Sequence, residues 1–283
     1  MSVMFKDKSG FNDDIVWWDV NNVLDMTSMF NGATAFKQNL NMWTLNTEVT
    51  VESMFLGATN AVYPNPPKKT SNKLGYHFTT KELLQTAVDL WTSPSSTATY
   101  GHINTWDVSM VTDMSSLFQS ILENAFNDDI GWWDVSNVAN MSSMFQNATN
   151  FNQDIGGWDT SSVLDMTSMF NGATAFNKPI GGWVTSSVTN MSEMFREATA
   201  FNKPIGGWVT SSVLDMSIMF YQASSFNQPI GNWDVSNVLD MTSMFNGATA
   251  FKQNLNMWTL NADVWVYNII LGATNAVYPN LPK

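Results

Sequence analysis

Hydrophobic positions recur every 25 residues along most of the chain. A typical unit is FNQDIGGWDTSSVLDMTSMFNGATA, residues 151–175. The same step separates phenylalanines at 126, 151, 176, 201, 226 and 251, tryptophans at 133, 158, 183, 208, 233 and 258, and paired methionines such as Met166 and Met169. A fixed period of this length predicts a solenoid, in which each unit packs mainly against its two neighbours.

Each unit has two halves with different spacing. In one half the apolar residues are three and four positions apart, as on one face of a helix: Met141, Met144, Phe145, Ala148 and Phe151. An Asp or Asn before the first Met reads as a helix N-cap; these are Asp25, Asp113, Asn140, Asp165, Asn190, Asp215 and Asp240. Gly32, Gly172 and Gly247 are placed to end that helix. The other half, from Ile155 to Val163 in one unit, is extended in character. We therefore predict a right-handed, leucine-rich-repeat-like α/β solenoid whose 25-residue coils each hold a short parallel strand and a short helix.

A longer repeat overlies the short one. Residues 24–46 recur unchanged as residues 239–261, an offset of 215, and residues 56–65 return as 271–280. By this alignment the chain begins inside a helical half-unit. We interpret it as an excerpt of a longer tandem protein; a first copy that lost its front, or a misassigned start, are the alternatives.

Between the two copies, residues 63–77 read YPNPPKKTSNKLGYH, a linker rich in proline and polar residues with three lysines, Lys68, Lys69 and Lys73. Thr79 and Glu82 then form a capping box, with Phe78 and Leu83 as a hydrophobic staple. The helix that follows has one apolar face and is expected to cover the front of an array. The predicted domains are closing coils of a preceding array (1–62), the linker (63–77), a capping helix and loop (78–100), and a solenoid of about seven coils (101–283).

Composition removes several function classes. The chain carries 24 acidic and 12 basic residues, a net charge of -12, so it offers no basic face for nucleic acid. No apolar run is long enough to span a bilayer, which argues against direct membrane insertion. With no cysteine and only His77 and His102, the chain has little material for catalytic or metal sites. We predict a protein that is not an enzyme and uses no cofactor.

Candidate contact residues are few. The regular Trp row is expected to lie in the core, because aromatic residues at one phase of a solenoid pack on their copies. Trp17 and Trp132 each precede a row Trp by one residue, so they point to the opposite face and are the candidate exposed contacts. The pairs Asp13–Asp14 and Asp128–Asp129 suit calcium chemically, but other units replace them, so we interpret them as solvated turns. The Thr-Ser-Ser steps, such as Thr160–Ser162, are similarly read as turn-capping residues rather than an ice- or glycan-binding ladder.

The motifs Phe-Asn-Gln-Asp-Ile-Gly-x-Trp-Asp-Val-Ser-Asn-Val and Asp-Met-x-x-Met-Phe resemble the 25-residue repeats of BspA-type leucine-rich-repeat surface proteins, which are also associated with bacterial lipoproteins. The resemblance covers nearly all of the chain outside the linker. It implies a leucine-rich-repeat-like solenoid displayed outside the cell, with adhesive or matrix-binding roles and no catalytic residue. Val184 and Val209 depart from the family pattern, because each replaces the Asp that follows Trp in the motif.

Together, the residues and the resemblance predict an extracellular structural or adhesive repeat protein at the cell surface. Its expected partners are copies of itself joined end to end as links of a fibre, or host or matrix proteins or glycans. The lysines of the linker would assist self-association by facing the acidic array. The alternative is a glycan- or protein-binding module of a surface or virion protein.

Overall fold

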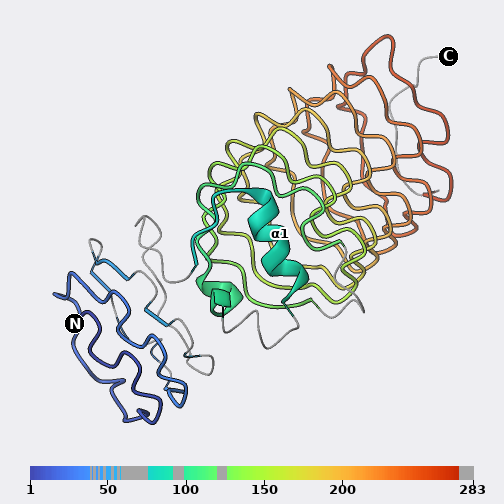
Figure 1. The fold of residues 1–283 in the computed structure, drawn as a ribbon. Helices are drawn as coiled ribbons and strands as arrows, with labels where there is room; N and C mark the ends of the chain where they lie inside the picture. The colour runs from blue at the N-terminus through green and yellow to red at the C-terminus, as the bar shows by residue number, and fades with distance from the viewer. Residues whose placement is uncertain are drawn as a thin grey trace. The chain divides into compact units, whose positions relative to one another are not determined.

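The computed structural model describes residues 1–38, 40, 43, 45–46, 49–51, 54–55, 58, 76–91, 99–119 and 126–273 (Figure 1). The chain divides into two compact units. The first unit holds Met1–Met110 together with Trp132–Asp134, and the second holds Val111–Gly131 together with Val135–Lys283. The domain limits predicted at residues 62, 77 and 100 stay predictions.

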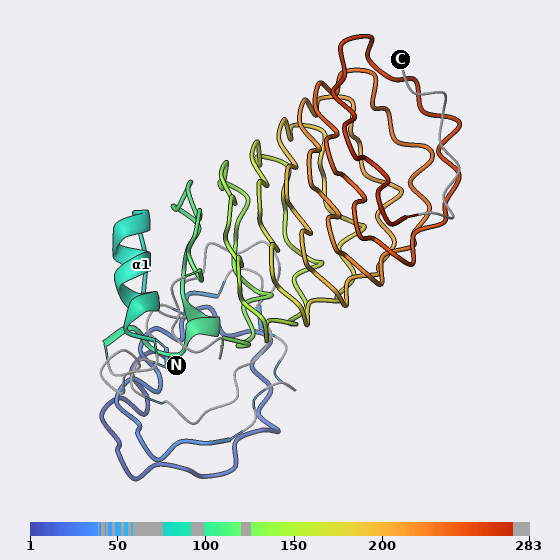
Figure 2. The same cartoon turned by 90° about the vertical axis from the view of Figure 1, so that its right-hand side faces the viewer.

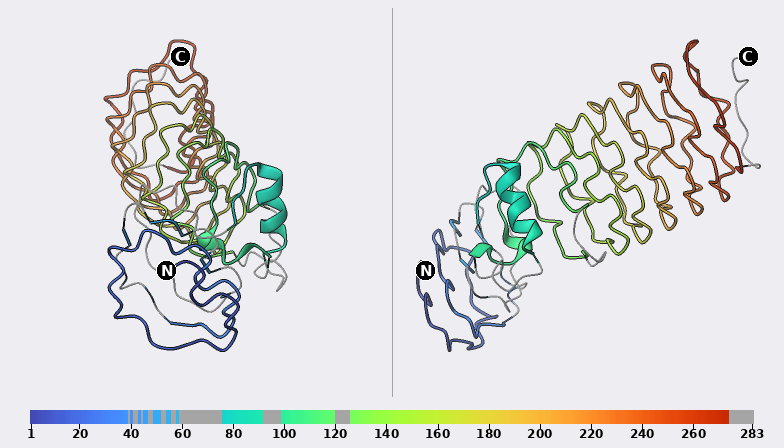
Figure 3. Two further views of the ribbon diagram at one scale, coloured as in Figure 1. Left: turned by 60° about the vertical axis from the view of Figure 1, so that its left-hand side comes forward. Right: turned by 45° about the vertical axis from the view of Figure 1, so that its right-hand side comes forward.

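In the second unit, successive 25-residue coils lie side by side, as the run of colour from green to red shows in Figures 2 and 3. Single parallel bridges join each coil to the next, for example Asn140 to Asp165 and Asp165 to Asn190. After the bridge residue of each coil, alternate backbone amides donate to carbonyls of the next coil. Phe145 donates to the Met169 carbonyl at 2.9 Å, and Asn147 donates to the Asn171 carbonyl at 2.7 Å. The first unit repeats this arrangement between Asp25 and Thr50.

The short helix predicted in each coil is wrong for residues 126–273, which contain neither a helix nor a strand longer than one bridge residue. Consecutive turns replace the helix. Met144 donates to the carbonyl of Met141 and Ala148 to that of Phe145, whereas the amides of Ser143 and Phe145 point to the next coil. Beyond its first turn, a helix bonds each amide to the carbonyl four residues earlier in the same segment. The turns place apolar side chains at the same spacing of three and four, so periodicity alone could not separate the two structures.

The Asx residues before each Met pair still act as capping residues, but they cap turns. Their Oδ1 atoms accept from the amide two residues later at 2.7–2.9 Å in all seven predicted positions. The glycines predicted to end helices lie instead in the left-handed region, with φ of 74° at Gly32, 72° at Gly172 and 75° at Gly247. Whether the coils belong to the leucine-rich-repeat class stays a prediction.

The core is built from rows of identical side chains. Phe145, Phe170, Phe195, Phe220 and Phe245 stack with ring centroids 5.5–5.6 Å apart and rings within 6–8° of parallel. The paired methionines of these coils are fully buried, which confirms the interpretation of their spacing as a core pattern. Because each coil must present the same ring at the same place, the rows fix the register between coils.

The Trp row is also core, as expected. Trp183 is 3% exposed, and its ring centroid lies 6.4 Å from those of Trp158 and Trp208. Its indole Nε1 donates to the Ile155 carbonyl of the preceding coil at 3.1 Å. Each buried Trp thereby satisfies its only polar atom while it stacks on its copies.

Polar ladders also join the coils. Thr160, Thr185 and Thr210 are buried, and each hydroxyl donates at 2.9 Å to a carbonyl of the next coil. A second ladder was not foreseen, although Asn follows Phe in nearly every unit. The side-chain oxygen of each such Asn accepts from the backbone amide one coil later at 2.8–3.0 Å; the acceptors in the second unit are Asn127, Asn152, Asn177, Asn202 and Asn227.

The first unit contains helix α1, Lys81–Asp89, and the 3-10 turn η1, Ile103–Thr105. The N-cap of α1 is Thr80, not Thr79, and its hydroxyl accepts from the Leu83 amide at 3.4 Å. Leu84, Ala87 and Val88 form the buried face of α1, while Leu83 is exposed, so the predicted staple with Phe78 is wrong. The shift of the cap by one residue turns Leu83 outward, because successive helical positions face different directions.

Candidate interaction surfaces

A regular row of polar, mostly half-buried residues runs along the coils. In each coil the bridged Asp or Asn is followed two residues later by Ser or Thr, and the Asx Oδ1 accepts from that residue's amide. We call this the Asx–hydroxyl row. Its pairs are Asp25/Thr27, Asp113/Ser115, Asn140/Ser142, Asp165/Thr167, Asn190/Ser192, Asp215/Ser217 and Asp240/Thr242.

The next coil departs from this row. Trp265 is bridged to Asp240, and Tyr267 accepts from the Ser243 amide at 2.8 Å, so both occupy the positions of the polar pair. Trp265 is 71% exposed and Tyr267 is 75% exposed. The 25-residue pattern did not single out these residues. Comparison of the two copies could have found them, because Thr50 and Glu52 stand at the corresponding positions of the first copy.

The two aromatic residues singled out from the sequence are both accessible. Trp17 is 80% exposed and Trp132 is 37% exposed, whereas their neighbours Trp18 and Trp133 are half-buried and buried respectively. This is the alternation expected for adjacent residues on extended backbone. Lys68, Lys69 and Lys73 lie outside the described residues.

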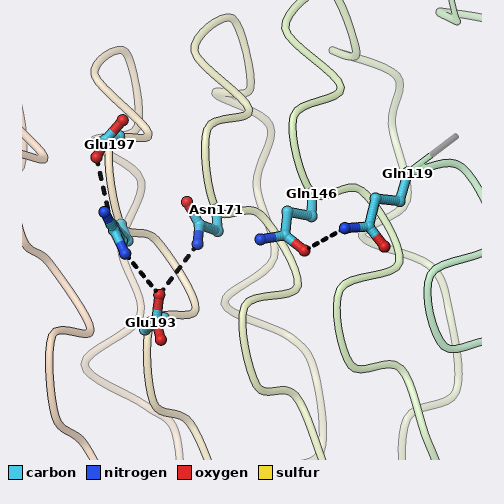
Figure 4. Close-up of polar contacts among 6 residues, drawn as sticks. Gln119, Gln146, Asn171, Glu193 and Glu197 are labelled. Atoms are coloured by element: carbon cyan, nitrogen blue, oxygen red, sulfur yellow. Dashed lines mark hydrogen bonds and ion pairs between the residues drawn. The ribbon is translucent and has the colours of Figure 1, made fainter. Parts of the chain in front are cut away.

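The only arginine of the chain forms a local charge cluster in the second unit (Figure 4). Arg196 contacts Glu193 at 3.0 Å and Glu197 at 3.2 Å, and its guanidinium lies 5.6 Å from the centre of the Tyr221 ring. The hydrogen bond to Glu193 is the main reason that the pKa of Arg196 is raised. Asn171 of the preceding coil donates to the same Glu193 carboxylate at 3.2 Å. The charged pairs lie within one coil, and the cluster contacts the neighbouring coils through the Asn171 hydrogen bond and the Tyr221 ring.

The acidic turns show no arrangement of a metal site. Asp14 accepts from the Val16 amide and Asp129 from the Gly131 amide, at 3.1 and 3.0 Å. In the part of the chain that the structure describes, no three His, Asp or Glu side chains are grouped to hold a metal ion. Within the same residues, no helix has the length and apolar character needed to cross a membrane.

One known family matches the repeats of this chain. The family model described as "Mycoplasma protein of unknown function, DUF285" matches residues 1–66, 86–190 and 178–278. The chain belongs to the DUF285 family. No curated protein and no solved structure gives a match.

The three DUF285 matches follow the internal duplication. The first match contains residues 24–46 and the third contains the identical residues 239–261. The chain is thus a tandem-repeat protein, in which one family pattern occurs several times. Family membership assigns no function to any residue, so a function for these surfaces can be inferred only from the chemistry of their side chains.

Proposed function

We propose that this chain is a structural and adhesive repeat protein of the cell surface, which associates with copies of itself end to end. The BspA-type resemblance motivates the location. The structural support is that the buried side chains of the coils stack on those of neighbouring coils. The polar groups of the ladders form hydrogen bonds with neighbouring coils. Such a molecule is a scaffold that presents outward-facing residues at a regular spacing.

The observation that carries the self-association is that the two sides of a coil differ and are complementary. Towards the next coil, Met141 and Phe145 offer amides to the carbonyls of Asp165 and Met169. In the opposite sense, the amide of Leu164 donates to the Ala139 carbonyl. Because one side of a coil does not match itself, copies can add only head to tail, and head-to-tail addition without closure gives a filament.

Charge supports the same association. The linker carries Lys68, Lys69 and Lys73 and no acidic residue, while the chain as a whole has a net charge of -12. Attraction between the linker of one copy and the acidic coils of another is expected to be weak and to decrease with salt.

Sedimentation velocity over a range of protein and salt concentrations tests this proposal. We expect linear oligomers that grow with protein concentration and shrink with salt, visible as strings by electron microscopy. The triple variant Lys68→Glu, Lys69→Glu, Lys73→Glu should reduce them, and the charge-matched control Lys178→Glu, Lys203→Glu, Lys252→Glu should reduce them less. A chain that remains monomeric at high concentration and low salt would overturn the filament. Antibody labelling of intact cells of the source organism tests the location separately, since only a surface protein is stained without permeabilisation.

A further inference from the structure

We infer that Trp265 and Tyr267 form a binding site for a neutral glycan. The two residues lie two positions apart on one backbone segment: Trp265 is bridged to Asp240, Tyr267 begins the turn that follows, and both side chains are exposed. The segment is held in place: the Trp265 carbonyl accepts from Met241 at 2.8 Å and the Ile269 carbonyl accepts from Phe245 at 2.9 Å. The rings are therefore displayed on ordered backbone.

These aromatic residues do not serve the core. In the same coil, the inward positions Val264 and Ile269 are 7% and 3% exposed, whereas Trp265 and Tyr267 are 71% and 75% exposed. A side chain that closed the hydrophobic interior would be covered by it. Leaving two large rings in water gains nothing for folding, since burial is what makes apolar surface stabilising.

The aromatic pair is present in only one of the two sequence copies. The copies are identical over residues 24–46 and 239–261, and they diverge just beyond. Where the second copy has Trp265 and Tyr267, the first has Thr50 and Glu52. In every preceding coil of the second unit the same two positions hold Asx and Ser or Thr, so the aromatic pair is a specific departure from a regular polar row.

The surroundings favour a sugar over other occupants. Asp240 of the preceding coil is bridged to Trp265, and Thr242 lies two residues after Asp240 in that coil. A carboxylate and a hydroxyl group therefore lie next to the aromatic segment. Sugar rings stack their C–H faces on aromatic rings and exchange hydrogen bonds with such groups at their edges. A wholly apolar partner would remove the Asp240 carboxylate from water and offer it no hydrogen bond beyond the one from the Thr242 amide. The net charge of -12 opposes an anionic polysaccharide, which leaves a neutral glycan as the matching ligand.

Calorimetric titration with four neutral hexasaccharides (chitohexaose, cellohexaose, maltohexaose and mannohexaose) tests the inference, with a heparin hexasaccharide as the anionic comparison. We expect at least one neutral probe to bind with a Kd of about 1 mM or tighter, and tryptophan fluorescence to change on binding. The double variant Trp265→Thr, Tyr267→Glu, which carries the residues of the first copy, should weaken that binding at least tenfold. Trp17→Ala, which removes another exposed Trp, should leave it unchanged.

Thermal melting shows whether the double variant is correctly folded, and its melting temperature should match that of the parent chain. Absence of binding by all four neutral probes, binding of the heparin fragment alone, or binding that survives the double substitution would each overturn the site. Titrations are made at concentrations where sedimentation shows monomer, so this result does not depend on whether the chain forms filaments.

Discussion

Residues 24–46 and 239–261 have the same sequence but lie in different units with different neighbouring coils. Among the described residues of both segments, the aromatic side chains make the same contacts. Phe30 stacks on Phe36 at 4.3 Å, and Phe245 stacks on Phe251 at 4.2 Å. The indoles of Trp43 and Trp258 both donate at 3.1 Å to an isoleucine carbonyl of the preceding coil.

What differs between the copies lies next to these segments. Phe5 and Phe11, which precede the first copy, are partly buried, whereas Phe220 and Phe226, which precede the second, are fully buried. In the following coil, the sequence changes from Thr50 and Glu52 to Trp265 and Tyr267. The comparison teaches that a coil's interior is reproduced wherever its sequence occurs, while its outer face is free to change.

The largest expected effect comes from removing matched core residues. Trp43→Ala and Trp258→Ala should each lower the free energy of unfolding by about 3–5 kcal/mol, because both leave a cavity and remove an indole hydrogen bond to the preceding coil. Urea unfolding followed by circular dichroism measures both costs, with Trp265→Thr as an exposed control that should change stability by less than about 0.5 kcal/mol. A much smaller cost in one copy would show that equal sequence had not produced equal packing.

A smaller effect is expected at the matched glycines. Gly32 and Gly247 have φ of 74° and 75°, a conformation that costs other L-residues about 1–2 kcal/mol. An added Cβ would also lie 2.5 Å from an Asp7 oxygen at Gly32 and 3.0 Å from Gln222 Cγ at Gly247. Gly32→Ala and Gly247→Ala should therefore both lower the melting temperature. Gly247→Asn should cost less, since Asn147 already adopts φ of 60° at the corresponding position; an equal loss for Ala and Asn would contradict the backbone explanation.

The smallest effect is expected from the exposed acidic face. The pKa values of Asp159 and Asp234 are lowered, chiefly by hydrogen bonds from the Ser161 and Ser236 side chains and then from their amides. A lowered pKa contributes stability that is complete above the ordinary value near 3.8 and is lost as the pH falls through the lowered value. Melting temperatures measured from pH 7 to pH 2.5 should fall below about pH 4.

The double variant Asp159→Asn, Asp234→Asn should show a shallower fall with acid, because an amide oxygen accepts the same hydrogen bonds without titrating. Asn190 already does so, accepting from the Ser192 amide at 2.9 Å. An unchanged acid profile would show that these carboxylates do not contribute to the stability of the second unit.

The candidate surfaces were only partly predictable. The alternation of Trp17 with Trp18 was enough to identify an exposed ring, because adjacent extended residues face opposite ways. The Trp265 and Tyr267 pair required knowledge of which two positions in a coil face outward. The 25-residue period aligns Trp265 with Asp240, but the exposure of the two rings was known only from the structure.

The sequence by itself determined the 25-residue period, the duplication and the composition of the core, since burial follows from the repetition of Phe, Trp and Met at fixed phases. Only the tertiary structure decided the backbone between them. The amides of Met141, Ser143 and Phe145 bond the neighbouring coil rather than their own segment, so turns replace the expected helix. The physical reason is that apolar spacing specifies which side chains are inward, whereas the choice between local and inter-coil hydrogen bonds depends on a neighbouring coil lying close enough to accept them.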